Sequence, residues 1–290
     1  MKFELYKDVK AFYGKTYDVL MRHEAQNLIP LGNIIIGNEG KDKTAWRDSA
    51  DWFMAVITDE TGIRLTAIMT PPWNITLYAT DNKIDDQALS CLIQGIKDNG
   101  ITVPGVITEI SLAKRFAEAF SVAMGIKFTI HKNMRQYELK KVNPEIPVIG
   151  TLRLAEDKDM AFLPFWIEGF QHDCFGHPLV PKEDPEPYHY QIGKERLYIL
   201  EVNGMPVSIA SKNREMQSVC GVSQVYTPPY FRGKGYATSC VAALSRIILG
   251  MGFTKCVLYT DLDNPTSNSI YQKIGYVPIC DSLEIKFEPG

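Results

Sequence analysis

The sequence lacks the features that would place the protein in a membrane, in a secretory pathway or on a polyanion. No run in its 290 residues approaches the roughly 18 apolar residues that a membrane-spanning helix needs. The N-terminus, MKFELYKDVKAFYGKTYDVL, has charges among its apolar positions and lacks the apolar core of a signal peptide. The formal net charge is only −3, which gives no overall attraction to nucleic acid or to an anionic membrane. We therefore expect a cytoplasmic protein that binds neither.

The cysteines also lack the spacing of a metal or redox motif. All six stand apart without C-x-x-C spacing, mostly inside apolar runs: Cys91, Cys174, Cys220, Cys240, Cys256 and Cys280. We expect reduced, buried thiols and no disulfide framework. One stretch, FQHDCFGHP, brings His172, Asp173 and His177 together, but its spacing fits no metal motif. It is expected to be a polar loop with half-buried rings, so we predict no metal.

Length and composition indicate two globular domains. With 45% hydrophobic and 22% charged residues, a chain of 290 residues is long enough for two cores. The stretch KVNPEIPVIGT, residues 141–151, carries two prolines and a glycine between two patterned regions. We place the boundary there and predict domains at 1–145 and 146–290. The tryptophans of the first half, Trp46, Trp52 and Trp73, are expected in its core.

The two halves resemble one another in the order of their elements. IRLTAIMTPPWN (63–74) and CGVSQVYTPPYF (220–231) are both strand-like runs that end in Thr-Pro-Pro-aromatic. In each half a helical pattern, a short strand and a second helix follow. This agreement favours the duplication of one α/β unit.

The second half is predicted to have the order βααβββαβαβ. The alternating stretch from Arg196 to Pro229 contains Asn203-Gly204, a strong hairpin signal, and should form three antiparallel strands. A helix with one buried face follows, and then a strand, a helix and a last strand. The predicted fold is α/β with a mixed sheet.

The turn YFRGKGYATS, residues 230–239, is a candidate anion site. A helix begins with about four N–H groups that have no partner in the helix, and its dipole adds partial positive charge there. Gly233 and Gly235 remove two Cβ atoms from the approach, the side chains of Arg232 and Lys234 add mobile positive charge, and Thr238 adds a hydroxyl. Neither the Walker spacing nor the third glycine of a dinucleotide fold is present. A basic, flexible bend is the alternative.

Two motifs together resemble the GNAT superfamily of N-acetyltransferases. Arg232-x-x-Gly235-x-Ala237 after a strand is similar to the family's pyrophosphate-binding signature. NPTSNSIYQKIGY, from Asn264 to Tyr276, is similar to its following helix. The resemblance covers about residues 148–288, and the first half resembles a degenerate copy. It implies two tandem GNAT-like domains, with acetyl-CoA as cosubstrate and no metal.

The resemblance also implies roles for individual residues. The strand before the turn would splay from its neighbour and pair with the pantetheine arm of coenzyme A, the amides of the turn would hold the pyrophosphate, and the next helix would contact the arm. These residues are Val225, Tyr226 and Thr227, then Arg232, Gly233, Lys234, Gly235, Tyr236, Ala237 and Thr238, then Asn264 and Ser267. Asn264 is equally well explained as a plain N-cap.

Tyr271 is the predicted general acid. In relatives a tyrosine at this position gives a proton to the leaving thiolate, whereas the alternative is a residue of the core. The general base is not visible, because the strand offers only Gln224 where relatives carry a glutamate. An ordered water could serve instead, and the remote candidates are Glu168, Glu201, Glu215 and His172.

One coenzyme A site per chain is expected. After TPPW the first half has no glycine pair and brings Asp81, Asp85 and Asp86 to the start of its helix, where carboxylates would repel phosphates. The sequence thus predicts an acyltransferase that moves acetyl from acetyl-CoA to a primary amine of a small, cationic molecule. The alternative is a non-catalytic acyl-CoA sensor or interaction module, and the protein is expected to be a monomer or a homodimer.

Overall fold

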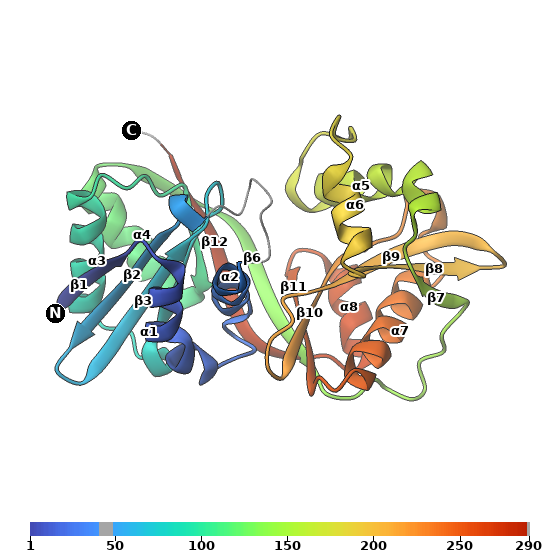
Figure 1. The fold of residues 1–290 in the computed structure, drawn as a ribbon, viewed down its shortest axis with the longest axis horizontal. Helices are drawn as coiled ribbons and strands as arrows, with labels where there is room; N and C mark the ends of the chain where they lie inside the picture. The colour runs from blue at the N-terminus through green and yellow to red at the C-terminus, as the bar shows by residue number, and fades with distance from the viewer. Residues whose placement is uncertain (41–48, 289–290) are drawn as a thin grey trace. The chain divides into compact units, whose positions relative to one another are not determined.

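The computed structural model describes residues 1–40 and 49–288 (Figure 1). The chain divides into two compact units. The first unit consists of residues 1–136, 260–263 and the chain from Pro278 onward, and the second of residues 137–259 and 264–277. Among the described residues no helix is both long and apolar enough to cross a membrane. Trp46 lies outside the described residues.

The first unit begins with a strand and two helices, continues through an antiparallel meander, and ends with a crossover helix, a strand and a last helix. The bounds are β1 Lys2–Tyr6, α1 Val9–Met21, α2 Leu28–Glu39, β2 Phe53–Asp59, β3 Gly62–Met69, β4 Ile75–Ala79, α3 Asp86–Asp98, β5 Gly105–Glu109 and α4 Ile110–Met124. A long strand, β6, follows at Lys127–Leu139. The short 3-10 turn Thr80–Asn82 lies between β4 and α3.

The second unit repeats this order. Its bounds are β7 Thr151–Leu154, α5 Leu163–Phe175, α6 Glu186–Gly193, β8 Leu197–Val202, β9 Met205–Asn213, β10 Val219–Tyr226, α7 Tyr236–Gly250, β11 Lys255–Asp261 and α8 Pro265–Ile274, and β12 Val277–Glu288 closes the chain. The order predicted for the second half is therefore confirmed. The predicted hairpin joins β8 to β9, with Asn203 and Gly204 in the left-handed region (φ 52° and 75°).

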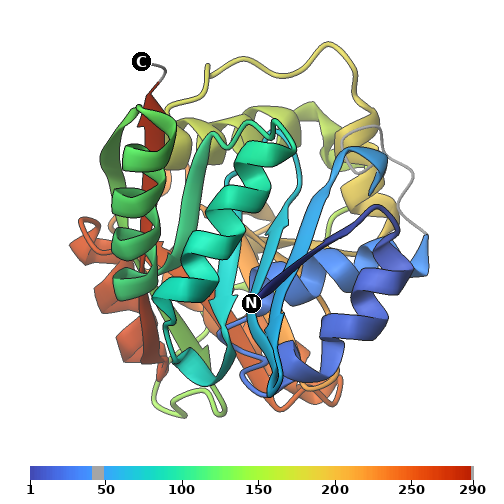
Figure 2. The ribbon, with the colours of Figure 1, turned by 90° about the vertical axis from the view of Figure 1, so that its left-hand side faces the viewer.

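Helices cover both faces of each sheet. In the first unit α3 and α4 lie over one face and pack on Phe53, Ala55 and Ile57 (Figure 2). The alternate residues Met54 and Val56 are fully buried on the other face. In the second unit α7 and α8 pack with Cys220 and Val222, and α5 and α6 pack with Ile199 and Ile209. The alternation of apolar residues along the strands thus gives each unit two apolar layers.

The last strand of the chain belongs to the first unit. In that unit the strand order is β1-β2-β3-β4-β5-β12-β6, and in the second it is β11-β10-β9-β8-β7. β12 pairs antiparallel with β5, from Ser282 opposite Glu109 to Lys286 opposite Gly105. The division into two units therefore differs from the predicted boundary at residue 145. Backbone hydrogen bonds to β5 place residues 278–288 with the first half of the chain. The assignment of the halves as degenerate and catalytic domains stays a prediction.

Several local expectations can be compared with the structure. Cys220, Cys240 and Cys256 are buried free thiols, as expected, whereas the other three cysteines are free but only half-buried. Trp52 is buried, but Trp73 is 52% exposed and is not a core residue. His172 and Asp173 were expected in a loop. They lie in the last turns of α5, because this helix continues to the left-handed Gly176.

Candidate functional site

β10 separates from β11 near its middle. The parallel register of the two strands runs from Val219 opposite Lys255 to Gly221 opposite Val257, while β10 continues to Tyr226. On its other side β10 carries a bulge: Ser223 faces Ser211 and Tyr226 faces Ile209, so three steps on β10 match two on β9. Gln224 stands inside this bulge with φ 50°. A bulge bends a strand, and this one leaves the end of β10 splayed from β11.

The residues expected to line the pantetheine arm lie at this splayed end. Val225, Tyr226 and Thr227 are half-buried. Ser208 Oγ lies 3.0 Å from the carbonyl oxygen of Tyr226 and 2.9 Å from Thr227 Oγ1. Tyr226 also contacts α5, where a Cβ added to Gly169 would come within 2.5 Å of its ring. The end of β10 is therefore held between β9 and α5.

The glycine turn that follows presents an uncapped helix N-terminus. Gly233 and Gly235 are exposed, with φ 76° and 78°, which only glycine adopts readily. A Cβ at Gly233 would meet no atom within 4 Å, and one at Gly235 would meet only Ile149 Cδ1 at 3.9 Å. Gly235 is the N-cap of α7, and within the part of the chain that the structure describes this helix has no side-chain cap. The first-turn N–H groups of this helix therefore have no side-chain cap, and the two glycines leave the approach to them open.

Arg232 does not supply the mobile charge that was expected. Its Nη2 donates to Asp173 Oδ2 at 2.6 Å, and its Nε donates to the Thr227 carbonyl oxygen at 2.8 Å. The guanidinium also lies 5.7 Å from the centroid of the Tyr226 ring. Arg232 thus ties the start of the turn to α5 and to the end of β10. Lys234 is exposed and lies 5.9 Å from the Phe231 ring.

α8 begins at an N-cap asparagine. Asn264 Oδ1 accepts a hydrogen bond from Ser267 N at 3.0 Å. Of the two interpretations of Asn264, the structure thus shows the N-cap. Ser267 is half-buried one turn into the helix. Tyr236, Ala237 and Thr238, in the first turn of α7, are also half-buried. Contact of any of these residues with coenzyme A stays a prediction.

Tyr271 is buried in α8, with 7% of its surface exposed. Its ring centroid lies 5.9 Å from that of Tyr276 and 6.4 Å from that of Tyr137. Burial raises the pKa of its phenol well above the ordinary value, and the nearby thiols of Cys174 and Cys240 raise the pKa further. Tyr271 is therefore both a core residue and a phenol that keeps its proton at neutral pH.

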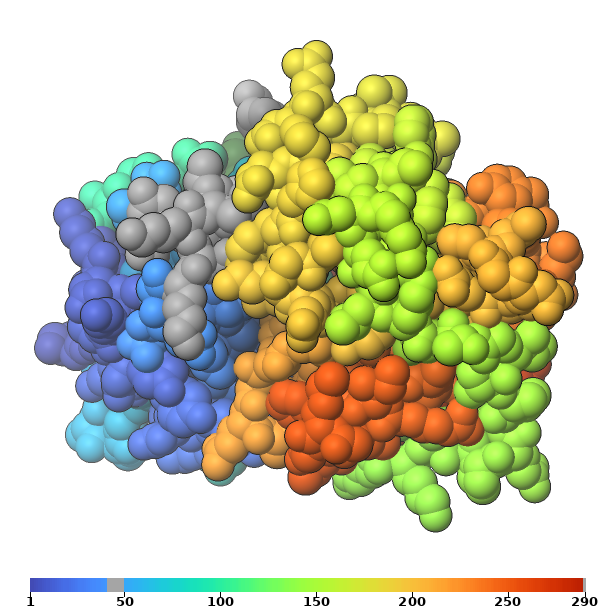
Figure 3. All heavy atoms as spheres, turned by 45° about the vertical axis from the view of Figure 1, so that its right-hand side comes forward, coloured from blue at the N-terminus to red at the C-terminus, as the bar shows by residue number. Residues whose placement is uncertain are grey.

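The candidate general bases all have other partners. Glu168 accepts from the Tyr188 hydroxyl at 2.8 Å, and that hydroxyl accepts from Lys182 N at 2.8 Å. The α5–α6 connection that this network anchors lies at the surface, coloured yellow in Figure 3. Burial and the hydrogen bond to Glu168 raise the pKa of Tyr188 to about 12. These bonds give Glu168 a structural role.

The other three candidates are also held by neighbours. Glu201 pairs with Arg153 at 2.8 Å, and Glu215 pairs with Lys212 at 2.5 Å. His172 Nδ1 lies 2.8 Å from the His177 carbonyl oxygen. No group of three metal-ligating side chains is present among the residues that the structure describes.

In the first unit, acidic side chains surround the start of the corresponding helix, α3. Asp85 is the N-cap of α3 and accepts hydrogen bonds from Gln87 N and Ala88 N at 2.9 and 3.2 Å. Asp81 pairs with Arg22 at 3.1 Å, and Asp86 with Arg115 at 2.7 Å. The pairing of β3 with β4 runs from Leu65 to Ile68 without a shift in register. The carboxylates therefore lie at the positions that the sequence predicts. Of the two corresponding strands, β4 and β10, only β10 has a bulge against its antiparallel neighbour.

Comparisons with known proteins identify the fold. Residues 165–276 match the sequence model of the acetyltransferase (GNAT) family. No curated protein sequence matches the chain significantly. A GCN5-related N-acetyltransferase from Sphaerobacter thermophilus is 15% identical, with a TM-score of 0.62 over 99% of this chain and 96% of that one. A GNAT-family acetyltransferase from Colwellia psychrerythraea is 10% identical, with a TM-score of 0.57 over 99% and 100%.

A tandem protein covers the chain completely. The tandem GNAT protein from the clavulanic acid biosynthesis pathway is 10% identical, with a TM-score of 0.56 over 100% of both chains. At such identities the likeness concerns the fold. The α/β fold with a mixed sheet that the sequence predicts is confirmed, and over the whole chain it is similar to the fold of this tandem GNAT protein.

Proposed function

The chain carries a GNAT-family acetyltransferase segment at residues 165–276, and from this premise we propose that it transfers acetyl from acetyl-CoA directly to the primary amine of a small, cationic molecule. One observation carries the proposal: the N-terminus of α7 is uncapped, open and flanked by Gly233 and Gly235. This helix comes after the strand that splays from its neighbour, with the 3-10 turn Pro229–Phe231 between them. An uncapped helix N-terminus of this kind attracts phosphate.

Several residues around this turn would together bind acetyl-CoA, the acetyl donor. The amides of residues 233–238 would bind the pyrophosphate, with Lys234 adding charge at the surface. Arg232 is bound by Asp173 and Thr227, so its side chain would hold the turn in shape while its amide faces the phosphates. The free backbone groups near Val225 would pair with the pantetheine arm. Bound acetyl-CoA supplies an activated thioester.

Tyr271 is proposed as the general acid. Its raised pKa keeps the phenol protonated, so a proton is available when a thiolate leaves. The same shift makes it a weak acid, so transfer is expected as the carbon–sulfur bond breaks rather than before. Because Gln224 stands in the bulge and the nearby carboxylates are paired, we propose that the acceptor ammonium loses its proton through water.

Acidic residues on the α5–α6 connection support a cationic acceptor. Glu183 and Asp184 are exposed there, and Glu186 is exposed at the start of α6. Their charges would attract an amine before it binds, and salt would weaken this effect. Asp173 is paired with Arg232 and Glu168 with Tyr188, so neither is offered as the ligand of the amine.

Thiol release from acetyl-CoA in the presence of a panel of primary amines tests the proposal. We expect release that depends on both the enzyme and the amine, with N-acetylated product detected by mass spectrometry. Saturable binding of acetyl-CoA without turnover on any amine would contradict transfer and favour a non-catalytic acyl-CoA sensor. An unchanged melting temperature in excess coenzyme A would contradict donor binding itself.

A further inference from the structure

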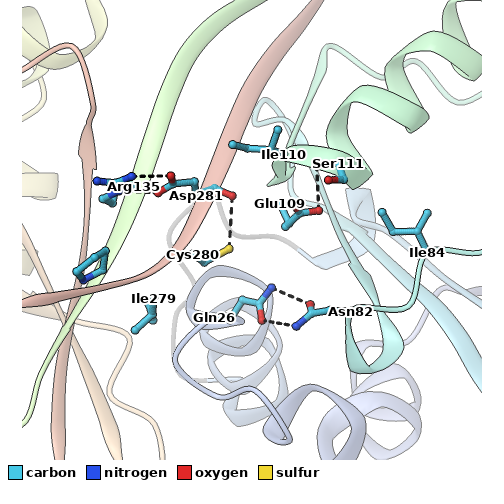
Figure 4. A pocket seen from close by; sticks show the side chains of 11 residues that line it. Gln26, Asn82, Ile84, Glu109, Ile110, Ser111, Arg135, Ile279, Cys280 and Asp281 are labelled. Atoms are coloured by element: carbon cyan, nitrogen blue, oxygen red, sulfur yellow. Dashed lines mark hydrogen bonds and ion pairs between the residues drawn. The ribbon is translucent and has the colours of Figure 1, made fainter.

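The first unit contains an open pocket of about 590 Å³ (Figure 4). Its walls come from the α1–α2 connection, the turn after β4, the start of α4, β6 and β12. The parallel register of β4 and β5 covers only Ile75–Thr76 opposite Val106–Ile107, and both strands continue beyond it. The pocket therefore lies where the first unit repeats the strand separation of the second, with different side chains around it.

Two pairs of polar side chains form part of its wall. Arg135 Nε and Nη2 donate to the two carboxylate oxygens of Asp281 at 2.6 and 2.7 Å. Gln26 and Asn82 exchange amide hydrogen bonds at 2.9 and 3.2 Å. Figure 4 shows both pairs beside the pocket. Among the described residues that line the pocket, Arg135 is the one cation, and it is bound to a carboxylate in bidentate fashion.

Glu109 has one oxygen to spare. Its Oε2 accepts from Ser111 N at 3.0 Å and from Leu112 N at 3.1 Å, which caps α4. Within residues 1–40 and 49–288 its other oxygen, Oε1, has no hydrogen-bond partner. The positive end of the α4 dipole is therefore already neutralised, and an incoming anion would meet a carboxylate.

The remaining wall is apolar and lies beside the Glu109 carboxylate. Ile84, Ile110 and Ile279 line the pocket together with the half-buried thiol of Cys280. Burial, and then the charges of Glu109 and Asp281, raise the pKa of this thiol to about 11. Arg135 balances the charge of Asp281, so a group inside the pocket lies beside the carboxylate charge of Glu109, which disfavours negative charge and favours positive charge.

We propose that this pocket binds a small molecule that carries a protonated primary amine on an apolar body, with the ammonium against Glu109 Oε1 and the apolar body against the three isoleucines. The unit would thus bind a cation where its counterpart is proposed to bind coenzyme A. Binding here requires no acyl transfer, so the proposal does not depend on the function proposed for the second unit.

The test uses three probes of matched size: n-pentylamine, n-pentanol and pentanoate. They are titrated into the full chain with 13C-labelled isoleucine δ1-methyl groups, and the methyl signals of Ile84, Ile110 and Ile279 are followed. We expect saturable shifts of these three signals with the amine, at least about 10-fold weaker binding of the alcohol, and none of the anion, since one charge pair of roughly 1.4 kcal/mol is a factor of 10.

Matched variants complete the test. Glu109→Gln keeps a carbonyl oxygen for the cap but removes the charge, and Glu118→Gln removes the same charge from an exposed position of α4. Glu109→Gln should weaken amine binding by about 10-fold while Glu118→Gln leaves it unchanged. Equal binding of the amine by both variants, equal binding of all three probes, or shifts confined to isoleucines of the second unit such as Ile248 and Ile274 would each overturn the proposal.

Discussion

The two units begin the helix after their splayed strand in opposite ways. α7 begins at Gly235 with no capping side chain, whereas α3 begins at Asp85, whose carboxylate accepts from two amides of the first turn. A side-chain cap satisfies the same N–H groups that a phosphate would use. The first unit is thus stabilised from within, while the second leaves its N–H groups free for a ligand. This difference distinguishes a helix start that its own side chain caps from one that is a candidate phosphate site.

The two units also differ in the next helix along the chain, α4 in the first unit and α8 in the second. α8 is capped by Asn264 and carries Tyr271 seven residues later, and α4 is capped by Glu109 and carries Phe116 seven residues later. Tyr271 and Phe116 are both buried in the core of their unit. The packing role of the ring is therefore common to both units, and the hydroxyl distinguishes the second.

Replacing Tyr271 by phenylalanine tests that distinction most strongly. Tyr271→Phe makes α8 resemble α4, and we expect kcat to fall by roughly 10²- to 10⁴-fold, the range of a general acid. Affinity for coenzyme A should be unchanged, because the ring is retained. Steady-state thiol release and calorimetric titration measure the two quantities. A variant that releases thiol as fast as the parent would restrict Tyr271 to packing.

An acidic residue at the start of α7 should cap this helix in the way that Asp85 caps α3. Gly235→Asp adds a carboxylate and a Cβ at φ 78°, and we expect affinity for coenzyme A to fall by at least about 100-fold, or roughly 2.7 kcal/mol. Titration calorimetry measures the loss. Gly204→Asp is the control, since it brings the same charge and a similar left-handed backbone (φ 75°) to a hairpin turn. Equal affinity in both variants would argue against the turn as the phosphate site.

Much of this comparison could be predicted from the sequence, because it rests on local chemistry. The glycine pair, the acids after TPPW and the Asn203-Gly204 hairpin all act within a few residues, and each was found where the sequence placed it. The pairing of β12 with β5 could not be predicted, because alternation marks a strand but not its neighbour.

Contacts between distant residues were also missed. Arg232 was expected to be mobile, and its bond to Asp173 joins residues 59 positions apart. The pocket beside Glu109 likewise depends on β6 and β12 meeting the start of α4. One signal was available for it: Glu109 stands in the first half where Asn264 stands in the second. That difference would have predicted a carboxylate, rather than an amide, at the start of α4.

High pH provides a smaller test of the ring hydroxyl. Below about pH 10 a tyrosine is protonated in both folded and unfolded chains. Above it the unfolded phenol ionises while the buried Tyr271 does not, since burial raises its pKa, so stability falls by about 1.4 kcal/mol per pH unit. In urea unfolding, Tyr271→Phe should lose about 1 kcal/mol less than the parent between pH 10 and 11, because the unfolded phenol is already half ionised at pH 10. Equal losses would show that the phenol of Tyr271 does not resist ionisation.

The smallest effect is expected at the cap of the first unit. Asp85→Ala removes the acceptor of two N–H groups and should lower the free energy of unfolding by about 1 kcal/mol, measured by urea unfolding. Asp86→Ala is the control, because Asp86 forms an exposed ion pair with Arg115 and should cost less than about 0.5 kcal/mol. Asp85→Ala should still bind no coenzyme A at α3, since the turn before it keeps Asp81 and Asn82 rather than a glycine pair. Coenzyme A binding with a stoichiometry of two would show that the cap alone separates the two units.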